Sequence, residues 1–408
     1  MLSNEKVKQF ADLAIKIGVN LQPNQELNIN SPIECAPIVR IMAQAAYDAG
    51  AKSVSVKWSD EKLSRINIDN QSIETLQEIP DWIVQRANYI VDKGCANISI
   101  SAGDPSIYAG VDPVKLQKSS QATRKAIKYY YDKMMANACR WLVVSIPTKA
   151  WADKVFPNCE DSVDKLWDAI ARTMRLDQDD PVKAWEEHII RLNRRAKFMN
   201  DKDFEYVHMT SKNGTDLMVG LSEGHIWCAA QEEAQDGIMF TANLPTEEIF
   251  TAPHKYKVNG VVHNALPLVD NGNIIDEFYV KFKDGKVVDY DAKQGKDALK
   301  NIIETDEGSC YLGEVALIGK NSPISQLGIL FYNTLFDENA SCHLALGKGY
   351  PSTVKGGVAM TKEQLDKVGV NESAEHCDFM VGTTDMNIEG ITKSGERVQL
   401  FVDGEWVI

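Results

Sequence analysis

The first 200 residues alternate between two hydrophobic patterns. Segments with apolar residues at helical spacing are followed by short runs that are continuously apolar or that alternate with polar residues, as strands do. The predicted helices span residues 2–18, 37–49, 80–91 and 114–138. The predicted strands span residues 27–30, 53–58, 96–103 and 141–147. This order predicts a doubly wound α/β domain with a mostly parallel sheet over residues 1–200.

The pattern changes after about Phe204, beyond a charged helix that is predicted for residues 181–197. Short alternating segments then follow one another with turn residues between them, which is typical of antiparallel strands. The clearest hairpin signals are Asn213-Gly214, Asp284-Gly285 and Asp403-Gly404. We therefore expect a second domain over residues 201–408, with a mainly antiparallel β structure in an α+β arrangement.

Net charge and composition exclude several classes of function. The 408 residues carry a formal net charge of −14, from 44 basic and 58 acidic residues, which disfavours nucleic acid and anionic membrane surfaces as partners. No run reaches the ~18 apolar residues of a membrane span, and MLSNEKVKQF lacks the apolar core of a secretion signal. The eight cysteines include no C-x-x-C pair, which argues against a thiolate zinc site. In a long chain without a secretion signal, we expect these cysteines to be reduced thiols of a cytoplasmic protein.

Some polar features of the chain carry no catalytic interpretation. No glycine-rich phosphate-binding fingerprint follows a strand, so AGDPSIYAG is interpreted as a turn from the sheet to a helix. His188 lies between acidic and basic residues and is interpreted as a solvated helical histidine, while His254 and His263 are expected in a loop and a strand. The chemistry must therefore come from elsewhere in the sequence.

Ionisable residues gather near the end of the chain, in short apolar segments. They are Glu314, Glu338, His343, Tyr350, His376 and Asp378, within GEVALIG, NTLFDENASCHLALGKGYP and SAEHCDFMVG. Carboxylates and imidazoles in such settings are typical of two-metal hydrolytic sites, because a carboxylate can bridge two ions and an imidazole adds a neutral donor. A further carboxylate is expected from PTEEIFTAPH, where a strand would direct only one of the adjacent Glu247 and Glu248 inward.

Local spacing adds geometry to part of this cluster. His376 and Asp378 are two residues apart, so they would share one face of a strand. Glu314 precedes the apolar run VALI, where a buried charge is costly unless it is paired or bound to a metal. Asp337 remains an alternative to Glu338 as a ligand in the loop-like stretch after the apolar run.

Taken together and in this order, these segments resemble a known family. The chain is similar from end to end to the metallopeptidase family M29, which includes aminopeptidase T and aminopeptidase S, and the resemblance is carried by NGTDLMVGL, NLPTEEIFTAP, GEVALI, NTLFDENASCHLALGKGYP and HCDFMVG. It implies a metal-dependent aminopeptidase that removes N-terminal residues from short peptides. It also implies a homodimer with its active sites in a large cavity, which the N-terminal domain would wall.

The resemblance also implies roles for individual residues. It implies that two divalent ions (zinc, cobalt or manganese) are held by Glu248, Glu314, Glu338, His343, His376 and Asp378. The catalytic residues are then Tyr350, which would stabilise the oxyanion, and Glu314, with Glu338 as the alternative base. The native metal, the preferred N-terminal residue and the division of ligands between the ions stay open.

Two further hypotheses remain. The chain could be a metallohydrolase of other amide substrates, such as a dipeptidase or an amidase. It could also be a peptide- or metal-binding protein without catalytic activity, although the presence of both Tyr350 and the carboxylates speaks against this.

Overall fold

The computed structural model describes residues 3–270 and 273–408. Within these residues the chain forms two compact units, which we describe separately. The first unit extends to Glu187 and includes Gln231–Pro245, and the second consists of His188–Ala230 and Thr246–Ile408. The chain passes from the first unit into the second within the long helix α10, Pro181–Lys202. It returns to the first unit for Gln231–Pro245.

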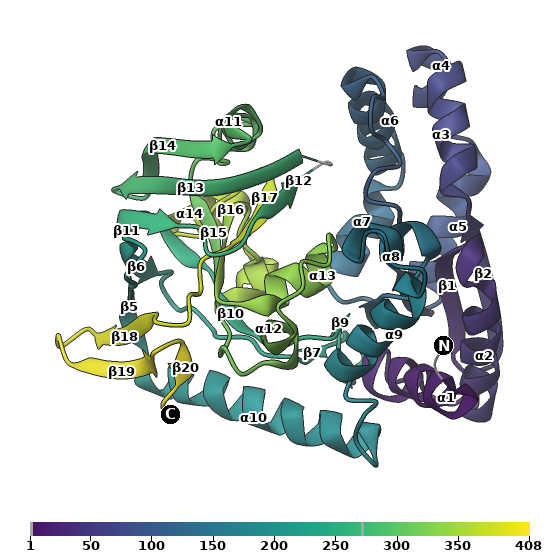
Figure 1. Ribbon diagram of the computed structural model, residues 1–408, viewed down its shortest axis with the longest axis horizontal. Coiled ribbons are helices and arrows are strands. Elements are labelled where there is room, and N and C mark those ends of the chain that lie inside the picture. Colours follow the sequence, from purple (N-terminus) through teal and green to yellow (C-terminus); the bar gives the residue numbers. More distant parts are fainter. Residues whose placement is uncertain (1–2, 271–272) are drawn as a thin grey trace. The chain divides into compact units, whose positions relative to one another are not determined.

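A parallel sheet of five strands forms the centre of the first unit (Figure 1). In spatial order its strands are β2 (Ser53–Ser59), β1 (Glu26–Pro32), β3 (Ala96–Ile100), β4 (Trp141–Val144) and β9 (Asn243–Leu244). The sheet and its connecting helices confirm the predicted α/β architecture. Strand β9 comes from the segment Gln231–Pro245 and follows the short hairpin of β7 (Glu232–Glu233) and β8 (Met239–Phe240).

Nine helices in the described part of the first unit precede α10. They are α1 (Asn4–Leu13), α2 (Ala36–Asp48), α3 (Glu61–Asn70), α4 (Ile73–Gln77), α5 (Asp81–Asp92), α6 (Pro113–Ala126), α7 (Lys128–Met135), α8 (Lys149–Val155) and α9 (Ser162–Thr173). The helix predicted for residues 2–18 corresponds to α1 and a following π-turn, Ala14–Gly18, with Leu2 outside the described residues. The single helix predicted for residues 114–138 is instead two helices, because the backbone of Ile127 is not helical.

Antiparallel strands dominate the second unit, as predicted. Its large sheet contains, in chain order, β5 (Phe204–Thr210), β6 (Asp216–Leu221), β11 (Pro253–His263), β12 (Leu268–Asp270), β13 (Asn273–Lys283), β14 (Lys286–Gln294), β18 (Asn387–Thr392), β19 (Arg397–Val402) and β20 (Glu405–Trp406). Short helices follow β14 and precede β18 in the sequence: α11 (Lys296–Ile303), α12 (Pro323–Leu327), α13 (Thr334–Asp337) and α14 (Lys362–Lys367).

The three hairpin signals of the sequence form hairpins in this sheet. They join β5 to β6, β13 to β14 and β19 to β20, and all three pairs are antiparallel. In the second and third turns both central residues have positive φ, namely 50° and 81° at Asp284-Gly285, and 47° and 75° at Asp403-Gly404. These angles match the twist of paired strands, and they explain why Asp-Gly predicts such turns.

A smaller antiparallel sheet contains the C-terminal ionisable residues. Its strands, in spatial order, are β10 (Ile249–Thr251), β15 (Leu312–Leu317), β16 (His343–Gly347) and β17 (His376–Met380). Every residue of β15 and β16 is buried. Val315, Leu344 and Phe379 lie opposite one another and form an apolar row on one face. The other face contains the candidate site.

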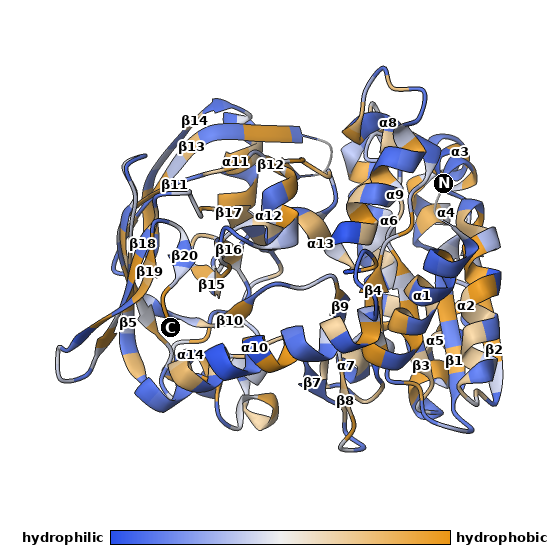
Figure 2. Cartoon of the chain, turned by 60° about the horizontal axis from the view of Figure 1, so that its bottom comes forward, coloured by the Kyte–Doolittle hydropathy of each residue, from blue (hydrophilic) through white to orange (hydrophobic). Residues whose placement is uncertain are grey.

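Helix α10 is amphipathic. Hydrophilic and hydrophobic residues alternate along it (Figure 2), and its apolar residues Trp185, Ile189, Leu192 and Met199 are buried. Although α10 is long, it is far too polar for a membrane span, and no other helix within residues 3–270 and 273–408 has the length and apolar character to cross a bilayer.

Candidate metal centre

The register of the smaller sheet brings the predicted residues onto one face. Glu314 lies opposite Ala345, which lies opposite Asp378, and His376 lies opposite Gly347. Directly opposed residues of antiparallel strands share a face, as do residues two apart in one strand. His343, which lies opposite Ala316, therefore belongs to the same face. The small residues Ala316, Ala345 and Gly347 leave space between the longer polar side chains. The expectation that His376 and Asp378 share a face is confirmed.

The adjacent glutamates before β10 point in different directions. Thr246–Glu248 has no helical or strand hydrogen bonding, and β10 begins only at Ile249. Glu248 Oε2 lies 3.2 Å from His343 Nε2, whereas Glu247 Oε2 lies 3.5 Å from His188 Nε2. Glu248 is therefore the member of the pair that faces the sheet residues.

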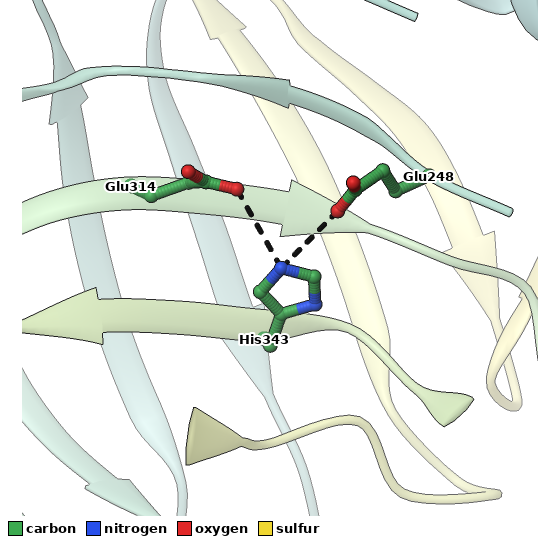
Figure 3. Close-up of side chains that lie close together, drawn as sticks. All are labelled: Glu248, Glu314 and His343. Carbon is green, nitrogen blue, oxygen red and sulfur yellow. Dashed lines mark ion pairs between the residues drawn. The ribbon is translucent and has the colours of Figure 1, made fainter. Parts of the chain in front are cut away.

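The polar side chains form two groups that share Glu314. In the first, His343 Nε2 lies 3.2 Å from Glu248 Oε2 and 3.5 Å from Glu314 Oε1 (Figure 3). In the second, His376 Nε2 lies 3.7 Å from the other oxygen of Glu314 and 3.4 Å from Asp378 Oδ1. Within each group the potential ligand atoms all lie within 4.8 Å of one another. Each oxygen of Glu314 thus faces a different imidazole.

The backbone fixes which nitrogen each imidazole presents to the carboxylates. His343 Nδ1 donates to the carbonyl oxygen of Ser341 at 3.3 Å, and His376 Nδ1 donates to that of Lys348 at 2.8 Å. A carbonyl can only accept, so Nδ1 carries the proton in both rings. The lone pair of a neutral ring then lies on Nε2, directed at the carboxylates. Histidine ligands of metals are oriented in this way.

The charges of this cluster are poorly balanced by the protein alone. Burial raises the pKa of Glu314, and burial together with the neighbouring carboxylates raises that of Glu338 well above its usual range. Burial acts against protonation of His376, but Asp378 and Glu314 outweigh it and raise its pKa to about 10. Glu248 Oε2 is buried and accepts no hydrogen bond from the described residues. A divalent cation would satisfy this oxygen and offset the carboxylate charges, so the donor set fits a metal.

Glu338 lies beside the two groups and belongs to neither. It begins the short turn Glu338–Ala340 and, with Asp378, lines a small pocket of about 50 Å³. Leu268, Val269 and Met380 contribute apolar walls to this pocket. Both apolar and acidic side chains therefore line the pocket, and residues 332–334 and Asp337 complete its lining.

Asp337, the alternative to Glu338, accepts two hydrogen bonds from the backbone. Its two carboxylate oxygens accept hydrogen bonds from the backbone N–H groups of Phe331 (2.7 Å) and Asn333 (3.0 Å). Burial raises the pKa of this carboxyl to about 7. These contacts hold the loop before α13, and Asp337 also lines the small pocket together with Glu338 and Asp378.

Tyr350 lies at the edge of the cluster. Its ring centroid is 4.9 Å from that of His376 and 6.3 Å from that of Phe250. Burial, reinforced by the nearby carboxylates, raises the pKa of the phenol well above its usual value of about 10. The hydroxyl therefore stays protonated at neutral pH and can donate a hydrogen bond.

Two buried residues that contact the site were not recognised from the sequence. His188 was expected to be solvated, but only 3% of it is exposed, and its Nε2 donates to the carbonyl oxygen of Thr246 at 2.9 Å. Asn339 is fully buried, and its Oδ1 accepts from the backbone N–H of Glu247 at 2.8 Å. The charged neighbours of His188 in sequence concealed its buried position, because on a helix they lie on other faces. Nothing in the sequence around Asn339, apart from its place in the motif, indicated that it is buried beside the site.

Comparisons with known proteins show which family the chain is similar to. A family model described as thermophilic metalloprotease (M29) matches residues 3–406. The chain is 44% identical to aminopeptidase 2 of Geobacillus stearothermophilus, over 98% of both chains. It is 40% identical to aminopeptidase AmpS of Bacillus subtilis, over 99% of this chain and 98% of that protein. The solved structure of AmpT from Thermus thermophilus superposes with a TM-score of 0.93, at 35% identity and 99% coverage of both chains. The chain belongs to the M29 family of thermophilic metalloproteases.

Proposed function

We propose that this protein is a metal-dependent aminopeptidase that removes N-terminal residues from short peptides. The observation that carries the proposal is the position of Glu314, whose two oxygens lie 3.5 and 3.7 Å from two different imidazoles. Such a carboxylate is suited to bridge two metal ions. The relatives that match over nearly the whole chain are named aminopeptidases, which supports this choice of reaction.

The two groups suggest a division of ligands between two divalent ions. We assign Glu248, Glu314 and His343 to one ion, and Glu314, His376 and Asp378 to the other. Glu338 completes the set predicted from the resemblance, as a ligand or as a base beside the ions. Oxygen and imidazole donors of this kind accept zinc, cobalt and manganese. When bound, such ions lower the pKa of a water molecule and polarise the scissile carbonyl.

The protein's own groups then supply positioning and proton transfer. Both oxygens of Glu314 face imidazoles, whereas one oxygen of Glu338 has a single amide contact, with Asn339 at 3.4 Å. We therefore favour Glu338 over Glu314 as the base that takes the proton of the attacking water and returns it to the departing amine. The protonated phenol of Tyr350 donates to the oxygen that becomes negative in the transition state.

The free N-terminus of the substrate would be recognised by a metal ion or by a carboxylate beside the small pocket. Glu338 and Asp378 line the pocket, and a carboxylate there can accept a hydrogen bond from the free α-amino group. A peptide whose N-terminus is blocked lacks this charge. The pocket thus favours removal of the first residue over cleavage within the chain.

Assembly and cellular location extend the proposal. We expect a homodimer, because the family resemblance implies one. We also expect the first unit to restrict access to short, unfolded peptides. All eight cysteines are free thiols, which is consistent with work in the reducing cytoplasm. Size-exclusion chromatography with light scattering tests the dimer, and a monomeric mass at micromolar concentration would refute it.

A panel of substrates tests the reaction. Purified protein is treated with EDTA and then supplied with zinc, cobalt or manganese. We expect hydrolysis of aminoacyl-p-nitroanilides that EDTA abolishes and one of these metals restores. Efficient cleavage of N-acetylated peptides would favour an amidase, and cleavage confined to dipeptides would favour a dipeptidase. Tight metal binding without hydrolysis of any substrate would favour a binding protein.

A further inference from the structure

Glu248 is the one proposed ligand of its group that lies outside regular secondary structure. His343 begins β16 and Glu314 lies within β15, so strand pairing fixes both backbones. The segment Thr246–Glu248 has no such pairing. Some other interaction must hold its backbone, because a metal ligand has to be kept within about 0.5 Å of its productive position.

Two buried side chains hold the same peptide group of this segment. The carbonyl oxygen of Thr246 accepts a hydrogen bond from His188 Nε2 at 2.9 Å. The N–H of Glu247, which belongs to the same peptide plane, donates to Asn339 Oδ1 at 2.8 Å. The Thr246–Glu247 peptide is therefore fixed at both of its polar ends, from two distant parts of the sequence.

Asn339 also reaches the second acidic segment of the site. Its Nδ2 donates to the carbonyl oxygen of Leu335 at 3.0 Å and to Glu338 Oε1 at 3.4 Å. These partners fix the orientation of the amide, since the oxygen must accept from N–H while the nitrogen must donate. One side chain thus links the backbone next to Glu248 to the carboxylate of Glu338.

The partners of His188 fix its orientation as well. A carbonyl can only accept, so Nε2 carries the proton, and Nδ1 is left to accept from Arg191 at 3.4 Å. The ring is 3% exposed, and its Nε2 also lies 3.5 Å from Glu247. His188 therefore contacts the segment at Thr246 and Glu247, whereas His343 lies beside Glu248.

We propose that Asn339 and His188 are positioning residues that hold the Thr246–Glu247 peptide and thereby direct Glu248, and through Asn339 also Glu338, at the metal ions. The proposal rests on the proposed function, because it assumes that Glu248 is a ligand. Neither residue contacts the reacting atoms in this account. Loss of groups that orient metal ligands typically weakens metal affinity about 10–100-fold.

The test compares the isosteric variant Asn339→Leu with a matched control, Asn264→Leu. Asn264 has the same kinds of partner, since its Oδ1 accepts from the N–H of Phe278, and its Nδ2 donates to the carbonyl oxygen of Leu266 and to the carboxylate of Asp276. Co²⁺ binding to the metal-free proteins is measured by calorimetry, together with the melting temperature and the Co²⁺ concentration that gives half-maximal activity. We expect Asn339→Leu to weaken Co²⁺ binding about 10–100-fold and Asn264→Leu to change it less than about threefold, although both melt earlier.

Each outcome bears on the proposal. If Asn339→Leu binds Co²⁺ as tightly as the wild type, the residue is structural only and the proposal fails. If Asn339→Leu does not fold, the pair His188→Leu and His188→Gln decides, because glutamine can still donate to Thr246. Weak binding in His188→Leu with recovery in His188→Gln supports the proposal, and wild-type affinity in both refutes it. If the wild type binds Co²⁺ tightly but has no peptidase activity, the proposed function is refuted. The comparison of Co²⁺ affinities between the variants would still test the positioning role.

Discussion

Replacing Asp306 by asparagine tests how the strand with His376 is held. Asp306 Oδ1 accepts hydrogen bonds from the N–H groups of Gly308 and Ser309, both at 2.9 Å. Its Oδ2 accepts from the N–H of Ala374 at 2.6 Å, two residues before β17 begins at His376. This carboxylate thus joins the loop before β15 to the loop before β17.

The size of the effect follows from these contacts. Asparagine keeps one acceptor oxygen but places an NH₂ group opposite the N–H of Ala374, so one charge-assisted bond is lost and two donors face each other. A hydrogen bond to a charged group contributes about 1.5–3 kcal/mol, and solvent screening reduces this because Asp306 is partly exposed. We expect a loss of about 1–2 kcal/mol in the free energy of unfolding. For a unit of about 200 residues this lowers the melting temperature by roughly 2–8 °C.

The effect should depend on pH with a defined sign. Burial acts to raise the pKa of Asp306, but donation from Ala374 and the other loop groups outweighs it, and the pKa is lowered. A carboxyl whose pKa is lower in the folded state stabilises the fold above its unfolded pKa of about 3.9, and this stabilisation is lost as the pH falls through the folded value. The difference between wild type and Asp306→Asn should therefore be constant from pH 7 to pH 5 and shrink below about pH 4.

Thermal melts of the metal-free proteins, followed by circular dichroism, measure this difference. Asp289→Asn is the control, because Asp289 is exposed and accepts from the hydroxyl of Tyr279, so we expect a change within about 0.5 kcal/mol. Equal melting temperatures of Asp306→Asn and wild type at pH 7 would contradict the reasoning. A difference that persisted unchanged below pH 4 would show that the carboxylate charge is not its source.

Three further predictions concern the site and its support. Tyr350→Phe should lower kcat about 10²–10³-fold while the metal content, measured by elemental analysis, stays the same, and a normal kcat would remove the phenol from the reaction. His343→Ala should lose metal and peptidase activity together, so full activity with normal metal content would show that His343 is no ligand. Phe379 lies on the apolar face of the smaller sheet, so Phe379→Ala should lower the free energy of unfolding by about 3–5 kcal/mol. The Co²⁺ affinity of the folded protein should stay unchanged, and weaker Co²⁺ binding would indicate that the two faces of the sheet are coupled.

Local patterns predicted those parts of the fold that local interactions determine. Asp284-Gly285 and Asp403-Gly404 form the predicted hairpins, because their positive φ angles are a property of the two residues themselves. The shared face of His376 and Asp378 follows from the period of a strand alone.

Features that depend on distant parts of the chain were not predictable in this way. Strand β9 has only two residues and pairs with β4, about 100 residues earlier in the sequence, so no local pattern indicates it. The buried positions of His188 and Asn339 depend on the path of the Thr246–Glu248 segment. The apolar spacing of α9 was present in the sequence, with Leu166 and Ile170 buried, but it was not recognised.

The most direct test of the central claim is a titration of metal-free wild type and Glu314→Gln with Co²⁺, in which bound metal and hydrolysis of leucine p-nitroanilide are measured in the same samples. We expect wild type to bind two ions per chain and its activity to rise as they bind. Because Glu314 faces both imidazoles, Glu314→Gln should bind both ions more weakly and lose activity. A Glu314→Gln variant with wild-type metal content and wild-type activity would contradict it.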